Sequence, residues 1–128
     1  MEMYYIQNLM QDEFGKVVVW LGFILILMFI DIATGFIQAY VNRNLKSRAM
    51  SVGLLKKAGL FLVLLGIVPL AVLMPEIIGT SVIIGVYVIE IVNELLSIIE
   101  NLQKMGVNIK IFDPIMQRLN GKDDKKHE

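Results

Sequence analysis

The chain has 128 residues, a hydrophobic share of 56%, a formal net charge of zero and a mean hydropathy of +0.67. A soluble protein of this length buries too little surface to hide that much apolar material in one core. The sequence holds no cysteine, which excludes disulfides and thiol chemistry. We therefore expect one all-α membrane domain over residues 1–128.

The first transmembrane span is predicted over residues 17–40, after a short head of residues 1–16. Trp20 and Tyr40 lie near its two ends, twenty residues apart. That separation corresponds to about 30 Å of helix, which matches the thickness of the hydrocarbon layer. Amphipathic aromatic side chains favour both membrane interfaces, so this pair marks the borders of the span.

A basic loop is predicted over residues 41–57. Short loops rich in Lys and Arg stay in the cytoplasm, so the loop predicts an N-terminus outside. On a membrane protein such a loop contacts anionic lipid headgroups more simply than nucleic acid. Its basic residues are Arg43, Lys46, Arg48, Lys56 and Lys57.

Two further spans are predicted over residues 58–74 and 77–99. Between them, Met74-Pro75-Glu76 forms a tight turn without a basic residue, which suits the outer face. The C-terminal tail, residues 102–128, then lies in the cytoplasm. Together these features predict about three spans with the N-terminus outside and the C-terminus inside.

Within the tail, Asp113-Pro114 can begin a short amphipathic helix at the membrane surface, with Asp as its cap and Pro in its first turn. A loosely ordered linker is the alternative. The last residues, 121–128, are rich in charge and are expected to be disordered.

The first span carries one polar face in its middle and second half. Thr34 and Gln38 follow Asp31 at spacings of three and seven, which places the three side chains on one side of a helix. Gly35 and Ala39 form a pair of small residues that allows another helix to approach closely. This side is therefore expected to contact protein or water, because a carboxylate facing lipid is costly.

The third span carries a longer polar stripe. Its members are Glu90, Asn93, Glu94, Ser97 and Asn101. We interpret the stripe and the polar face around Asp31 as the lining of a pore or the seam of an oligomer. An inert bundle joined by interhelical hydrogen bonds is one alternative, and a proton or ion relay is another. Neither Lys nor Arg falls inside a predicted span, so these carboxylates are expected to lack cationic partners.

Enzymatic chemistry is not indicated. The sequence has one histidine and no cysteine, which leaves no cluster of metal-ligating residues. Neither a nucleophile-elbow pattern nor a Gly-rich phosphate loop occurs in it. No catalytic, cofactor-binding or metal site is therefore predicted.

An ordered set of short motifs resembles the toxin-secretion/phage-lysis holin family of Gram-positive bacteria and their phages. The similarity runs from about residue 25 to residue 119. One departure is visible, since Asn108-Ile-Lys110 stands where family members often carry a proline. The motifs are Asp31-Ile-Ala-Thr-Gly35, Asn44-Leu-Lys-Ser47, Ser51-Val-Gly53-Leu-Leu-Lys56-Lys57, Glu94-Leu-Leu-Ser97-Ile-Ile-Glu100-Asn101 and Met105-Gly106-Val107.

The resemblance implies a protein that forms homo-oligomers in the bacterial cytoplasmic membrane and opens lesions at a programmed time. An endolysin passes through the lesions and the cell lyses, and some relatives release toxins instead. An antiholin is a possible further partner, and no nucleic acid is expected. A small ion channel or proton-coupled transporter subunit using Asp31 or Glu90 is the alternative function, and a membrane scaffold is a third. The third span lying in the interface, with the C-terminus outside, is the alternative topology.

Overall fold

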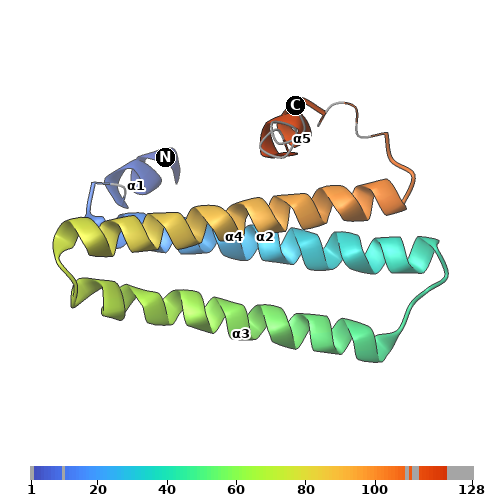
Figure 1. The fold of residues 1–128 in the computed structure, drawn as a ribbon, viewed down its shortest axis with the longest axis horizontal. Coiled ribbons are helices and arrows are strands. Elements are labelled where there is room, and N and C mark those ends of the chain that lie inside the picture. The colour runs from blue at the N-terminus through green and yellow to red at the C-terminus, as the bar shows by residue number, and fades with distance from the viewer. Residues whose placement is uncertain (1, 10, 109, 111–112, 121–128) are drawn as a thin grey trace, which may run out of the picture.

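The computed structural model describes residues 2–9, 11–108, 110 and 113–120. All regular secondary structure in these residues is helical, and three long helices lie alongside one another in an up-down-up arrangement (Figure 1). Two short helices flank them at the ends of the chain. The helices are α1 (Glu2–Leu9), α2 (Glu13–Val41), α3 (Ser47–Val72), α4 (Glu76–Lys104) and α5 (Asp113–Asn120).

Three segments are long and apolar enough to cross a membrane, namely Gly15–Val41, Ser47–Val72 and Glu76–Lys104. Each has 26 to 29 residues, which gives about 40 Å of helix and exceeds the hydrocarbon thickness. The prediction of an all-α membrane protein with three spans is therefore confirmed. Large apolar side chains cover the outside of the bundle, as a surface facing lipid requires; examples are Phe29, Leu62 and Ile89.

The predicted basic loop over residues 41–57 was wrong in its extent. Helix α3 begins at Ser47, so the connection after α2 shrinks to residues 42–46. The segment from Ser47 to Lys57 contains good helix formers and no proline, and the helix therefore continues through its charged residues. Arg48, Lys56 and Lys57 consequently lie on α3 instead of in a loop.

The two ends of the chain also contain more helix than the sequence suggested. The head, expected to be a short polar segment, forms α1 and the first residues of α2. The third span continues to Lys104, where a Schellman turn ends it. Gly106 has a φ of 80° and donates to the Gln103 carbonyl oxygen over 2.9 Å. Of the two alternatives for the tail, the short helix after Asp113 is present as α5; residues 121–128 lie outside the described part.

The half of the bundle nearer the α3–α4 turn has an apolar interior. Ile24, Leu64 and Tyr87, one from each long helix, are fully buried there. Tyr87 donates a hydrogen bond from its hydroxyl to the Leu64 carbonyl oxygen over 3.2 Å. Near the turn, Gly79 of α4 lies against the Ala71 carbonyl of α3, where a larger residue would collide with backbone. Shape and packing therefore hold this half together.

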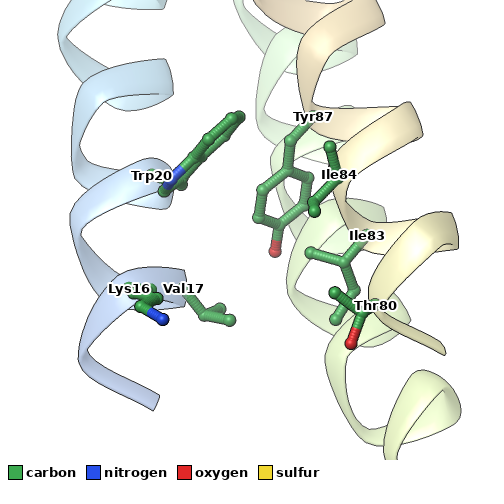
Figure 2. Close-up of a pocket in the computed structure, with 7 residues that line it drawn as sticks. All are labelled: Lys16, Val17, Trp20, Thr80, Ile83, Ile84 and Tyr87. Atoms are coloured by element: carbon green, nitrogen blue, oxygen red, sulfur yellow. The ribbon is translucent and has the colours of Figure 1, made fainter. Parts of the chain in front are cut away.

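A shallow groove of about 210 Å³ separates α2 from α4 at the same end. Figure 2 shows Trp20 of α2 and Tyr87 of α4 directed into it from opposite sides, above Val17 and Ile83. The walls are mostly apolar. The aromatic pair thus fills space between two helices, and Trp20 reports on their separation.

Candidate functional site

Three charged residues meet at one level of the bundle. Asp31, Lys57 and Glu94 each lie ten residues from the helix end that faces the α2–α3 connection. Because neighbouring helices run in opposite directions, these equal offsets place all three about 15 Å inside the same end of the bundle. Residues far apart in the sequence thereby form one cluster.

Lys57 joins the two carboxylates. Its Nζ lies 2.7 Å from Asp31 Oδ2, and 2.5 Å and 2.7 Å from the two Glu94 carboxylate oxygens. Asp31 and Glu94 are 5% and 3% exposed, whereas the Lys57 side chain is 23% exposed. A lysine ammonium has three donors, which suits this bridging position. One side chain of α3 therefore ties α2 to α4.

Asn101 completes the contact between α2 and α4. Its Nδ2 donates to Asp31 Oδ1 over 2.8 Å, to the Asp31 carbonyl oxygen over 3.2 Å and to Thr34 Oγ1 over 3.1 Å. Thr34 in turn donates to the Asp31 carbonyl oxygen over 3.1 Å. Gly35 lies beside Asn101, and a Cβ there would be 3.5 Å from Nδ2. Asp31 is thus held from both neighbouring helices.

Glu90 adds a third carboxylate one helical turn from Glu94. It is 6% exposed, and its Oε1 is buried without a hydrogen-bond partner. The cluster therefore holds three carboxyl groups against one lysine. Burying a polar atom without a partner costs free energy, so Glu90 marks a position that packing alone does not explain.

The expectation that the carboxylates lack cationic partners was wrong, because Lys57 had been assigned to the loop. A signal for this contact was present in the sequence. Buried carboxylates need a cation, and Lys57 directly precedes the apolar run that begins at Ala58. Extending the helix backwards by eleven residues, from Ala58 to Ser47, brings Lys57 inside the bundle.

A groove of about 350 Å³ leads from the end of the bundle to the cluster. Several residues singled out in the sequence line it, while Thr34 lies half-buried just behind. Its lining mixes polar side chains with apolar ones such as Ile32 and Phe36, and the groove reaches Asp31 and Lys57. The predicted site residues in the lining are Asp31, Gly35, Gln38, Ala39, Lys46, Lys57, Ser97 and Asn101.

Asn93 does not join the other polar residues of α4. It is exposed on the outside of the bundle, one turn from the exposed Ile89. Arg43, Lys46 and Arg48 are also exposed, at the end of the bundle near the α2–α3 connection. Among the described residues no group of His, Cys, Asp or Glu could hold a metal ion.

The cluster is suited to a two-state contact. A buried ion pair with complete hydrogen bonds is stable, but removing one partner leaves an uncompensated charge at a cost of about 3–5 kcal/mol. If water fully hydrates the side chains of Asp31, Lys57 and Glu94, that cost disappears. The geometry therefore favours either a closed, dry arrangement or an open, wet one, with little stability between them.

Comparison with known proteins gives one family and one similar protein. The sequence profile of the bacteriophage holin family matches residues 8–121, which include all three spans. An uncharacterized protein of Halalkalibacterium halodurans is 35% identical over 100 residues, covering 75% of this chain and 73% of that protein. No solved structure matches.

Proposed function

Because the chain belongs to the bacteriophage holin family, we propose that it oligomerises in the membrane and opens lesions that release an endolysin. It is a multi-pass protein of the cytoplasmic membrane, in a family without enzymatic activity. The observation that carries the proposal is the extent of the family match, which runs through all three spans. A toxin is the alternative cargo, as in some relatives, and an antiholin is a candidate partner.

In this proposal the structure corresponds to the closed protomer. Large apolar side chains cover its outer surface, and the carboxylates of Asp31, Glu90 and Glu94 are buried inside, as a protomer surrounded by lipid requires. A lesion wide enough for a folded enzyme needs polar surfaces that face water. Separating the helices at Lys57 exposes Asp31, Glu94 and Asn101 together, which supplies such a surface. Breaking the Lys57 contacts is therefore the proposed opening step.

We propose that Asn93 lies in the contact between neighbouring protomers. Its amide faces lipid, where it has no water to bond, and a second chain can satisfy it at a gain of about 1 kcal/mol. Asn93→Leu should reduce chemically cross-linked oligomers in isolated membranes and delay lysis. Ile89→Val, one turn earlier on the same surface, is the matched control. Equal cross-linking in both variants would show that the contact between protomers does not involve Asn93.

The proposed orientation places the N-terminus outside and the basic end of the bundle in the cytoplasm. The distribution of Lys and Arg supports it. Since the chain has no cysteine, single replacements give clean probes. Gln11→Cys should react with a membrane-impermeant maleimide in intact cells, whereas Asn44→Cys should react only after lysis. The reverse pattern would invert the topology.

The central experiment is inducible expression in a bacterium, with and without a cytosolic endolysin, while turbidity and membrane potential are followed. A lag, then abrupt growth arrest, with lysis only when the endolysin is present, is the expected result. Depolarisation without release of the endolysin would favour a small channel instead. Normal growth, with the protein shown to be in the membrane, would contradict lesion formation and favour an antiholin or scaffold.

A further inference from the structure

A second groove lies along α3, next to the groove that leads to the buried cluster. Lys46, Ala49 and Gly53 line both grooves. The second groove has a volume of about 500 Å³, with Lys46, Arg48 and Lys56 as its charged residues. Ala49, Val52 and Gly53 form the rest of its lining, and a Cβ on Gly53 would meet nothing within 4 Å. The groove thus combines cationic side chains with a smooth apolar floor.

The three cations have no acidic partner among the described residues. The ion pairs seen there use Lys57 and Lys104 instead, and Glu100 at this end of the bundle is already paired with Lys104 over 2.9 Å. Helix α3 also begins here, with neither a side-chain cap nor an acid in its first turn. Its free N–H groups and dipole add to the positive potential. The groove therefore attracts an anion.

The surroundings of the groove favour a lipid over a free anion. Arg48 and Lys56 lie eight residues apart on a helix that crosses the membrane, so Lys56 begins about 12 Å deeper. Its ammonium must extend toward the interface along an apolar stem. Leu55 beside it is 70% exposed and Val52 is 43% exposed, so the floor continues into the surface that faces acyl chains.

We propose that this groove binds one anionic phospholipid, with its phosphate between Lys46, Arg48 and Lys56 and an acyl chain along Val52 and Gly53. The site gives the protein a preference for anionic lipid in the leaflet at this end of the bundle. It acts separately from lesion formation, because none of its charged side chains belongs to the buried cluster. Adjacent lysines thereby serve different partners, since Lys57 binds carboxylates and Lys56 binds phosphate.

The test is native mass spectrometry of the purified full-length protein, released from micelles containing phosphatidylglycerol or phosphatidylcholine. The wild type should retain one phosphatidylglycerol much more tightly than phosphatidylcholine. The triple variant K46Q/R48Q/K56Q should lose this preference. The expected loss of affinity is roughly a hundredfold, on the order of fivefold for each basic residue at a membrane surface.

Two controls distinguish a specific lipid-binding site from nonspecific electrostatic attraction of anionic lipid. The variant R43Q/K110Q/R118Q removes the same charge from exposed positions outside the groove and should keep the bound lipid. Keeping a positive charge at position 56, as in K46Q/R48Q/K56R, should recover part of the preference. Equal loss in both triple variants would overturn the site, as would displacement of the lipid by inorganic phosphate or glycerol phosphate at matched concentration. Circular dichroism checks that each variant is helical, and lysis timing separately tests the lesion proposal.

Discussion

The two halves of the bundle hold the same three helices together by different means. Toward the α3–α4 turn, Ile24, Leu64 and Tyr87 interlock as an apolar core with one hydrogen bond between helices. Toward the α2–α3 connection, Lys57 and Asn101 join the helices through charged groups and several short contacts. The apolar half depends on shape, and the polar half depends on keeping charges paired.

The difference matters because lipid weakens the usual driving force for packing. Acyl chains are as apolar as leucine, so burying Leu64 against another helix gains packing contacts rather than escape from water. The polar half gains more from closure, since its charges have no good alternative in lipid. It also gains from opening, because water hydrates the same charges. We infer that the apolar half sets the register of the helices and the polar half controls their separation.

The largest expected effect comes from removing the lysine that bridges the polar half. Lys57→Met keeps the length of the side chain and leaves Asp31 and Glu94 buried without a cation. The closed bundle should lose about 3–5 kcal/mol, and lysis should begin much earlier than in the wild type. The measurement is the time of turbidity loss at matched protein level. Unchanged timing would mean that the Lys57 contacts do not restrain opening.

A variant with a neutral cluster separates the loss of the Lys57 ion pairs from general damage to the fold. The triple variant D31N/K57M/E94Q removes the cation and both charges that need it. Because Asp31 and Glu94 are then neutral and only the Glu90 carboxyl group remains as in the wild type, the triple variant should recover most of the stability that Lys57→Met loses. If lysis requires charges along the opened surface, this variant should fold and yet lyse late. A triple variant as unstable as Lys57→Met would show that side-chain shape, and not charge, explains the effect.

The next effect tests the apolar half at its tightest contact. A methyl group on Gly79 would overlap the Ala71 carbonyl, which cannot move without shifting α3. Gly79→Ala should therefore destabilise the bundle by about 2 kcal/mol. Gly85→Ala on the same helix has open space and should be neutral or slightly stabilising. SDS-induced unfolding in mixed micelles, followed by the fluorescence of Trp20, measures both.

Sequence patterns predicted the number of spans because the length and hydropathy of each segment largely determine whether that segment inserts into the membrane. The start of α3 could not be placed in the same way. Charged residues such as Arg48 and Lys56 end an apolar run without ending a helix, so the start predicted from hydropathy and the observed start of α3 differ by eleven residues. The turn at Met74-Pro75-Glu76 was predicted well, because proline restricts the backbone directly.

Within the site, periodicity placed Asp31 and Thr34 on one face, and they do share contacts with Asn101. Periodicity did not exclude Asn93, which lies at the edge of the polar stripe and faces outward. The pairing of Lys57 depended on the relative level of three helices. That level follows from loop lengths and packing, which one helix pattern does not contain.

A smaller effect is expected from the amide that links α4 to Asp31. Asn101→Leu preserves the size of the side chain and removes its three hydrogen bonds, leaving Asp31 with Lys57. Interhelical hydrogen bonds in membranes contribute about 0.6 kcal/mol on average and at most about 1.7, so we expect a loss of about 1 kcal/mol. Lysis should advance modestly. A loss of stability as large as that of Lys57→Met would show that Asn101 contributes as much as Lys57 to holding the helices together.

The smallest effect should come from Tyr87→Phe, which removes the hydroxyl bonded to the Leu64 carbonyl oxygen and leaves the ring in place. Because that bond is 3.2 Å long and packing dominates this half, the cost should be about 0.5 kcal/mol. Trp20 faces Tyr87 across the groove between α2 and α4 (Figure 2), so its fluorescence follows the unfolding directly. If Tyr87→Phe costs more than Asn101→Leu, hydrogen bonding would govern both halves and the division between shape and charge would fail.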